Sequence, residues 1–176
     1  MQQQTVILIT PVHLSCIYYN RANREVASGL GALRNVKKEA IMFKRVDHIG
    51  IAVQDIDQAV ALYTHAFGIT EWERIDLPER HTSVAVARFG EVLIELIAPS
   101  SDEASFAKYL REKGPGMHHI AYTVDDIAAS LDELRDRGVQ LIDQEARPGI
   151  HNTLVAFVHP KAVQGVLVEL VQHQKH

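Results

Sequence analysis

Two histidines and two glutamates stand out because each lies in a predicted strand beside aliphatic residues. His48 and His119 are each followed by Ile, and Glu95 and Glu169 each stand between two apolar residues. Burying a single carboxylate is costly unless it is paired or bound to a cation. Together the four side chains form an open set of two nitrogen and two oxygen ligands. Such a set suits a divalent ion such as Co, Mn, Ni or Zn and leaves positions for substrate oxygens.

The alternative to a metal site is a pair of buried Glu–His ion pairs that hold two halves of the protein together. A single histidine in a strand is more often a core or edge residue than a ligand. The recurrence of His and Glu at matched positions favours the metal site. His118 competes with His119 for the ligand position, and the repeat register together with strand alternation favours His119.

The matched positions belong to an internal repeat. Residues 47–56 recur as residues 118–127, so that His119 follows His48 by 71 residues, and residues 90–96 recur as residues 165–170. Each copy has the pattern of a β-α-β-β-β module, over about residues 43–99 and 116–172. Because one module is too small to bury its sheet face alone, the sequence predicts an α+β domain over residues 43–172 in which two modules form one metal-binding cleft.

Local signals support the first module. Residues 46–53 alternate as a strand does, and Asp55 is placed to cap a helix that ends near Gly68. Strands are expected at residues 83–88 and 92–97, followed by a short helix that opens at residues 99–102. The Gly-Pro-Gly at 114–116 is the best internal boundary. Within the first strand, small residues at 50 and 52 share a face with the histidine at 48 and leave room beside it.

Composition excludes several classes of protein. The 176 residues carry a formal net charge of -4, which argues against a surface that coats nucleic acid. No apolar run reaches the roughly 18 to 20 residues that a membrane span requires, so we expect a soluble protein. Cys16 is the only cysteine, which excludes an intramolecular disulfide and a thiolate metal cluster and fits a reducing compartment such as the cytoplasm.

Residues 1–41 differ from the remainder of the chain. They carry five Lys or Arg and two Glu, and they lack the periodicity seen later. An amphipathic organelle-targeting peptide is one interpretation. We favour the other, a poorly ordered N-terminal extension that precedes a natural start at Met42.

Residues 47–53, 116–121, 157–161 and 165–170 resemble the methylmalonyl-CoA epimerase family, within the vicinal oxygen chelate (glyoxalase-like) superfamily. The resemblance covers about residues 43–172, and its most specific part is the closing FVHPK segment followed by GVLVEL. The resemblance implies a metal-dependent isomerase that interconverts (2R)- and (2S)-methylmalonyl-CoA. In this reaction the α-proton is removed from one face of the substrate, and a proton is returned to the other face of the resulting enolate.

The resemblance also implies roles for individual residues. His48, Glu95, His119 and Glu169 would hold the divalent ion, for which cobalt is favoured, and Glu169 would be the base on one face. Some bacterial members have a second Glu where this chain has Val84. His151, in a loop that other members also furnish with His, is therefore the candidate for the second base or for a carboxylate-binding group. An exposed loop histidine is the alternative.

Other functions found in the superfamily are the alternatives for this chain. A glyoxalase I-type lyase acting on glutathione hemithioacetals or a catechol dioxygenase would use the same kind of site, and a metal-free binding protein would lack it. The resemblance favours an acyl-CoA substrate and a homodimer. The net charge and the absence of a long apolar run predict neither nucleic acid nor a membrane as partner. The expected compartment is the cytoplasm, or the mitochondrial matrix in a eukaryote.

Overall fold

The computed structural model describes residues 41–175, so the expectations for residues 1–40 lie outside the described part of the chain. The first module consists of β1 (Arg45–Ala52), α1 (Ile56–Phe67), β2 (Glu73–Leu77), β3 (Thr82–Phe89) and β4 (Val92–Pro99). After α2 (Ala107–Lys113), the second module consists of β5 (Gly116–Thr123), α3 (Ile127–Asp136), β6 (Arg147–Pro148), β7 (Thr153–Val158) and β8 (Val168–His173). Short 3-10 helices occupy Pro78–Arg80 and Pro160–Val163.

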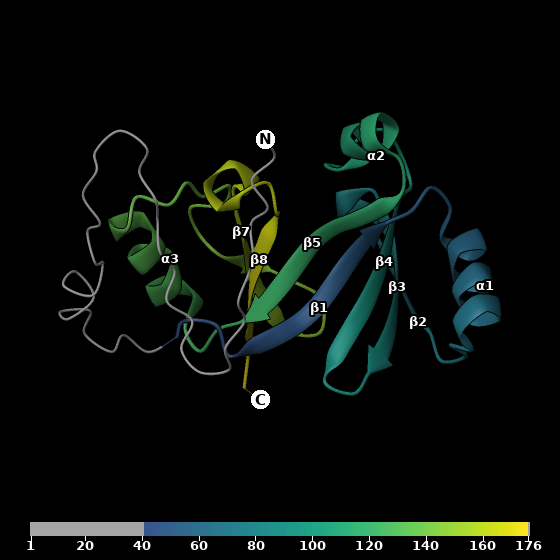
Figure 1. The fold of residues 1–176 in the computed structure, drawn as a ribbon, viewed down its shortest axis with the longest axis horizontal. Coiled ribbons are helices and arrows are strands. Elements are labelled where there is room, and N and C mark those ends of the chain that lie inside the picture. The colour runs from purple at the N-terminus through teal and green to yellow at the C-terminus, as the bar shows by residue number, and fades with distance from the viewer. Residues whose placement is uncertain (1–40, 176) are drawn as a thin grey trace, which may run out of the picture. The chain divides into compact units, whose positions relative to one another are not determined.

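The two modules share one eight-stranded sheet with the order β2-β3-β4-β1-β5-β8-β7-β6 (Figure 1). Within each module the first and last strands pair in parallel, as β1 with β4 and β5 with β8. Strands β1 and β5 pair antiparallel and join the modules. The predicted α+β fold of two repeated β-α-β-β-β modules is therefore confirmed, and its four central strands are the first and last strands of the two modules.

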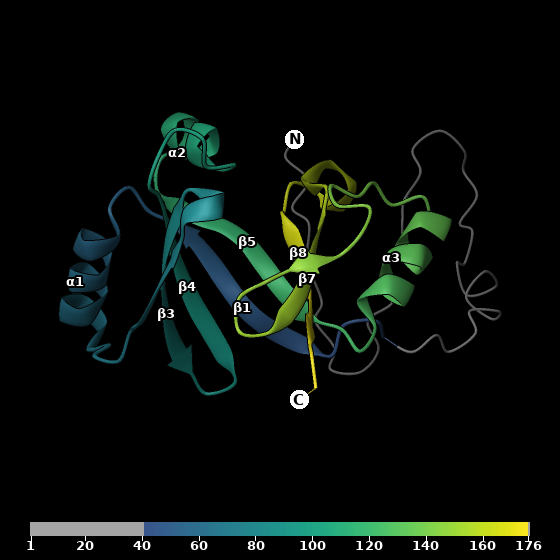
Figure 2. The same ribbon diagram turned by 180° about the vertical axis from the view of Figure 1, so that it is seen from behind.

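Capping residues begin the two long helices at equivalent positions. Asp55 accepts a hydrogen bond from the backbone of Gln58 at the start of α1, and Asp126 accepts one from Ala129 at the start of α3. Gly68 ends α1 in the left-handed conformation, with φ of 71°. Viewed from the front and from behind, α1 and α3 lie at opposite ends of the described domain, with the sheet between them (Figures 1 and 2).

The expected strands at residues 83–88 and 92–97 correspond to β3 and β4, but the helix expected to open at residues 99–102 begins only at Ala107. A turn delays the helix, because Ser101 Oγ accepts a hydrogen bond from the backbone of Glu103. Ala104 and Phe106 then insert into the core of the first module. Among the described residues, no helix combines the length and the apolar character that crossing a bilayer requires.

Two β-bulges interrupt the pairing of β1 with β5. From Val46 to Ile49 strand β1 advances three residues while β5 advances two, so β1 has one extra residue there. From Gly50 to Ile51 strand β1 advances one residue while β5 advances two, so the extra residue is in β5. The bulges therefore fall on residues 47–48 and on His118. A bulge turns a side chain away from strict alternation and is common beside active sites.

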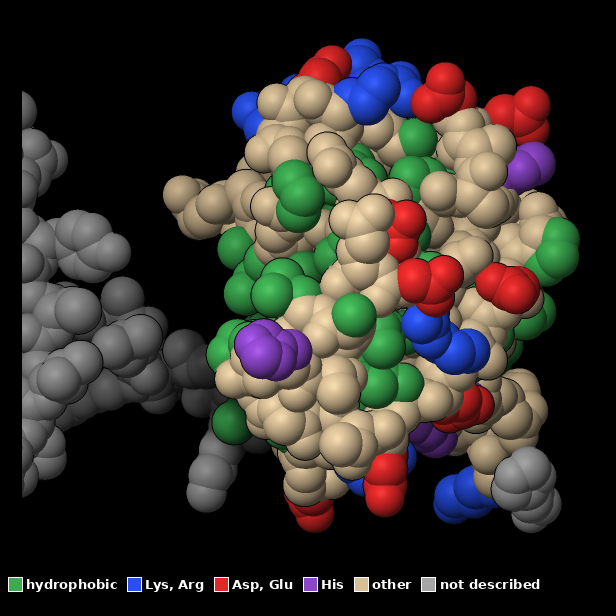
Figure 3. Space-filling model, turned by 90° about the vertical axis from the view of Figure 1, so that its right-hand side faces the viewer, with side chains coloured by type: hydrophobic (Ala, Val, Ile, Leu, Met, Phe, Trp, Pro, Cys, Tyr) green, Lys and Arg blue, Asp and Glu red, His purple; other side chains and the backbone are tan. Residues whose placement is uncertain are grey.

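The outer surface that faces the reader in Figure 3 has a mixed character. Acidic, basic and hydrophobic side chains are interspersed on this face, which is the right-hand side of the view in Figure 1. The exposed hydrophobic side chains of the described chain include Leu62 and Phe67 of α1. A mixture of both charges produces no extended field of one sign.

Candidate metal centre

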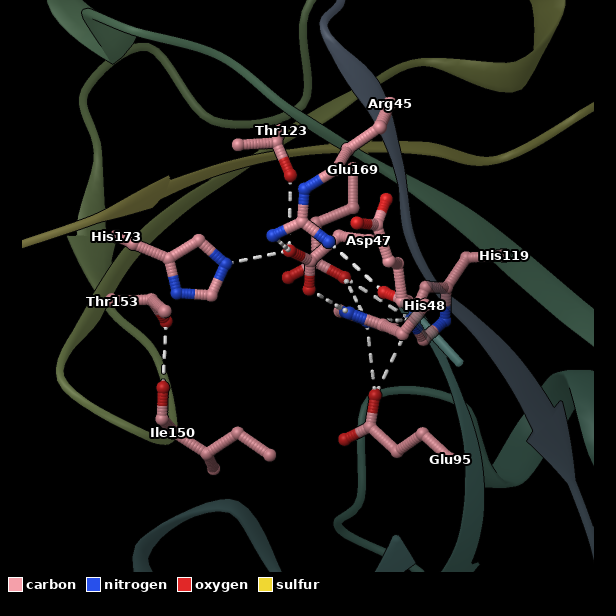
Figure 4. Close-up of polar contacts among 11 residues, drawn as sticks. Arg45, Asp47, His48, Glu95, His119, Thr123, Ile150, Thr153, Glu169 and His173 are labelled. Carbon is pink, nitrogen blue, oxygen red and sulfur yellow. Dashed lines mark hydrogen bonds and ion pairs between the residues drawn. The ribbon is translucent and has the colours of Figure 1, made fainter. Parts of the chain in front are cut away.

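The four side chains singled out by the repeat converge at the centre of the sheet. His48 comes from β1, Glu95 from β4, His119 from β5 and Glu169 from β8, so that each central strand supplies one of them (Figure 4). The two Nε2 atoms lie 3.1 Å apart. Glu169 Oε2 is 3.2 Å from His48 Nε2 and 3.1 Å from His119 Nε2. Glu95 Oε2 is 3.0 and 3.7 Å from the same two nitrogens.

These distances are those expected between neighbouring ligands of one ion. With ligand bonds of about 2.1 Å, two ligands at a right angle are about 3.0 Å apart and two at the tetrahedral angle are about 3.4 Å apart. One ligand atom each from His48, Glu95 and His119 can be chosen so that all three lie within 4.8 Å of one another. The donor set therefore fits a single divalent cation, and these three residues form a candidate metal-binding triad.

A glycine makes the space for one of the imidazoles. Gly50 of β1 pairs with His119 of β5, and a Cβ atom built on Gly50 would lie 2.0 Å from Cε1 of the His119 ring. Any larger residue would displace the ring. The sequence expectation that small residues beside His48 leave room is thus confirmed at Gly50, although the side chain that uses the room is His119.

The four side chains are buried, and in the described structure they neutralise one another. The side chains of Glu95 and Glu169 are 12% and 8% exposed. Burial alone would raise the pKa of each carboxyl group, but hydrogen bonds with His119 and His48 lower both pKa values below the ordinary range. Burial likewise opposes protonation of the two histidines, but their contacts with the carboxylates raise the pKa of both.

The residue before each of these histidines also faces the site. Asp47 Oδ1 lies 3.1 Å from His48 Nδ1, and His118 Nδ1 lies 3.0 Å from His119 Nδ1. Burial, followed by the charge of His119, lowers the pKa of His118 to about 4. The preference for His119 over His118 agrees with the triad, but strict alternation does not hold in this strand, because the bulge turns His118 toward the site as well.

A cavity of about 480 Å³ opens onto these side chains. Its walls include aliphatic and aromatic side chains such as Val84, Leu93 and Phe157. Arg80 and Arg147 also contribute to the lining, and the guanidinium of Arg147 stacks over the Phe157 ring at 5.4 Å from the ring centroid. The cavity thus combines an apolar wall and a polar centre with charged side chains of both signs, since Glu79 and Glu103 line it as well.

His151 and Val84, the two positions considered for a second base, both line this cavity. Val84 is 2% exposed and packs in the core of the first module, where its side chain has no proton to exchange. His151 has a positive φ of 53°, and its Nε2 lies 2.9 Å from Glu73 Oε2. The structure therefore places His151 at the cavity and in an ion-pair contact with the edge strand β2.

Sequence reasoning missed a polar group behind the site. Asp47 Oδ2 accepts hydrogen bonds from Thr123 Oγ1 at 3.0 Å and from His173 Nε2 at 2.6 Å (Figure 4). The available signal was that Asp47 and His118 occupy equivalent positions of the repeat, each directly before a histidine. No such signal pointed to His173.

The fold defines a protein of glyoxalase-like architecture, and its convergent His and Glu side chains form a candidate metal centre. The chain belongs to the Glyoxalase/Bleomycin resistance protein/Dioxygenase superfamily, whose family model matches residues 47–157. It is 37% identical to the mitochondrial methylmalonyl-CoA epimerase of Homo sapiens over 129 residues, which are 73% of each chain. It is also 37% identical to an ethylmalonyl-CoA/methylmalonyl-CoA epimerase of Cereibacter sphaeroides, over 74% of this chain and 99% of that one.

Solved structures agree with this assignment. A variant of Streptomyces coelicolor methylmalonyl-CoA epimerase, in complex with 2-nitronate-propionyl-CoA, superposes with a TM-score of 0.70 at 32% sequence identity. The match covers 74% of this chain and 95% of that one. The resemblance seen in the sequence is therefore confirmed at the level of the fold and of the family.

Proposed function

We propose that this protein is a methylmalonyl-CoA epimerase, an isomerase that interconverts the (2R) and (2S) forms of its substrate. The observation that carries the proposal is the convergence of two imidazoles and two carboxylates, at 3.0 to 3.7 Å, from the four central strands. The identity to epimerases, over almost the whole described domain, supports the substrate and the reaction class.

In the proposed site His48, Glu95, His119 and Glu169 hold a divalent cation. Co, Mn, Ni and Zn all suit two nitrogen and two oxygen ligands, and the family resemblance favours Co. When bound, the ion would neutralise negative charge that develops on the substrate oxygens as the α-proton leaves. Its binding requires deprotonated imidazoles, so metal uptake would release the protons that the paired carboxylates hold on the two histidines.

Glu169 is proposed as the base on one face of the substrate. Its Oε2 faces the two imidazole nitrogens, which leaves Oε1 as the atom that would take the α-proton. The low pKa of the carboxyl group keeps it ionised at neutral pH, which is the form a base requires. The side chain of Glu169 is 8% exposed, so little water can compete for the proton.

His151 is proposed as the second base, which would return a proton to the other face. It lines the same cavity as Glu169, and its imidazole nitrogens can donate or accept a hydrogen bond. To act, its Nε2 would have to leave Glu73 Oε2, which holds it at 2.9 Å. Val84 lacks any exchangeable proton at the position where some family members have a Glu.

The proposed partner is an acyl-CoA thioester, an anionic substrate that the positive charge of Arg80 and Arg147 in the cavity lining would favour. We propose a homodimer, which sedimentation at micromolar concentration tests: a species of 19.7 kDa would contradict it. The proposed compartment is the cytoplasm, or the mitochondrial matrix if the source is eukaryotic.

The decisive experiment follows exchange at the α-carbon. Protein, Co²⁺ and (2R)- or (2S)-methylmalonyl-CoA are incubated in deuterated water, and α-deuterium uptake is measured by mass spectrometry. A parallel assay offers methylglyoxal and glutathione, the substrates of a glyoxalase I-type lyase. We expect deuterium uptake from both epimers and no turnover in the parallel assay. Lyase activity without α-deuterium uptake would replace the proposed function with the alternative.

A further inference from the structure

The two residues that precede the proposed histidine ligands occupy equivalent positions of the repeat. Each contacts the Nδ1 atom of the histidine that follows it. Asp47 precedes His48 and His118 precedes His119, and each sits at a bulge in the pairing of β1 with β5. In a regular strand, neighbouring side chains point to opposite faces, so a contact between their polar atoms would not form. The bulges bring each pair onto one side, at the Nδ1 atom of the ligand histidine.

Asp47 is itself held in place. The residue is 5% exposed, and its Oδ1 lies 3.1 Å from His48 Nδ1. Its other oxygen accepts hydrogen bonds from the Thr123 hydroxyl at 3.0 Å and from His173 Nε2 at 2.6 Å (Figure 4). These donors come from β5 and β8, so the carboxylate that contacts His48 is fixed from the second module.

His118 is fixed by aromatic rings instead of hydrogen-bond donors. Its ring centroid lies 5.5 Å from that of Phe106 and 5.4 Å from that of Tyr109, with the rings tilted by 58° and 75°. Its Nδ1 lies 3.0 Å from His119 Nδ1. One of the two nitrogens must therefore donate its proton to the other.

An imidazole that binds a metal through Nε2 carries its proton on Nδ1 and needs an acceptor there. We propose that Asp47 and His118 are paired positioning residues, which accept the Nδ1 protons of His48 and His119 and so direct both Nε2 atoms to one cation. This inference rests on the metal centre of the proposed function. The two acceptors differ in charge, since one is a carboxylate and the other a neutral imidazole, so His48 should be the more strongly donating ligand.

The test measures the affinity for Co²⁺ alone, by competition with a chelator and by the visible absorption of bound Co²⁺. Asp47→Asn and His118→Phe should each weaken binding by about 10- to 100-fold, the usual effect of losing the partner of a metal-ligating histidine. His118→Asp, which copies the arrangement at position 47, should bind at least as tightly as the parent protein. Asp125→Asn and His65→Phe, at exposed positions, are the matched controls and should not change the affinity.

Equal affinities for His118→Phe and His118→Asp would overturn the role of His118, because the two variants differ in the acceptor. A second measurement does not depend on any variant. In the Zn²⁺-loaded parent protein labelled with ¹⁵N at histidine, long-range proton–nitrogen correlations should show both ligand imidazoles protonated at Nδ1. Metal bound through Nδ1 would overturn the inference.

Failure of this inference is distinguishable from failure of the proposed function. If the parent protein binds neither Co²⁺ nor Zn²⁺, the metal centre is wrong and the inference falls with it. If the metal binds as described but no α-deuterium enters methylmalonyl-CoA, the proposed substrate is wrong while the positioning residues stand.

Discussion

Glu169→Gln is the perturbation that best separates the two roles assigned to one residue. Glutamine keeps an oxygen that can serve as a ligand and nearly the same volume, but it is not a base. The position is 8% exposed, so water has little room to replace the lost carboxylate. Loss of a general base typically costs 10²- to 10⁴-fold in rate. We therefore expect α-proton exchange to fall by at least about 100-fold, which corresponds to about 2.7 kcal/mol in the barrier.

Glu95→Gln is the internal comparison because the two carboxylates contact the same atoms. Glu95 Oε2 lies 3.0 and 3.7 Å from the two imidazole nitrogens, against 3.2 and 3.1 Å for Glu169 Oε2. Each variant removes one charge from the same buried cluster, so their effects on metal affinity should be similar. If Glu95 acts only as a ligand, its amide variant should lose less than about tenfold in exchange rate once the metal is saturating.

The assay is α-deuterium uptake by methylmalonyl-CoA, with Co²⁺ raised until the rate no longer increases and the bound metal measured separately. Glu91 is exposed in the turn between β3 and β4, so Glu91→Gln is the control for replacing a glutamate by a glutamine outside the cluster. Equal losses for Glu169→Gln and Glu95→Gln would refute the assignment of Glu169 as base. Near-normal exchange in Glu169→Gln would do the same, and would make His151→Gln the next variant to measure.

Three further predictions test other parts of the structure. Gly50→Ala should weaken Co²⁺ binding by about tenfold or more, because the new Cβ would meet the His119 ring at 2.0 Å, whereas Gly116→Ala has open space and should bind normally. Without metal, the two site histidines have raised pKa values, so their protonation stabilises the folded state fully below pH 6.5 and progressively less as the pH rises. The two carboxyl groups have lowered pKa values, so their contribution is present above pH 4.5 and does not change between pH 6 and pH 8. Chemical denaturation should therefore show lower stability at pH 8 than at pH 6 for metal-free protein, and saturation with Co²⁺ should reverse that order. A chain that begins at Met42 should fold and retain activity by circular dichroism and the exchange assay; loss of either would contradict the interpretation of residues 1–41 as a dispensable extension.

The sequence predicted the fold and the convergent residues through its repeat. A glutamate between aliphatic neighbours is costly to bury unless its charge is compensated. Two such glutamates at matched positions therefore indicate where the two copies meet. Pairing of β1 with β5 then brings His48 and His119 together although 71 residues separate them. The repeated segments at residues 47–53 and 118–124 therefore predict most of the architecture, because they correspond to the two strands that join the modules.

The missed features depend on contacts that periodicity does not encode. A β-bulge adds a residue without altering composition, so strand alternation does not reveal that Asp47 and His118 each contact the histidine that follows them. The strands β2 and β6 lie at the two edges of the sheet, and β6 has only two residues, which is too short for an alternating pattern. The contact of His151 with Glu73 joins these edge regions and follows from tertiary packing alone.

The distribution of the four side chains over the modules has an evolutionary consequence. Each module holds one histidine and one glutamate, which is half of a chelating site. An ancestor with a single module would have bound a cation between two identical copies, and every mutation would have changed both halves at once. Fusion of two such copies into one chain would release that constraint, and the two halves of this chain do differ, since the position equivalent to Asp47 is His118. An enzyme that treats two faces of one carbon differently is a natural product of such a history.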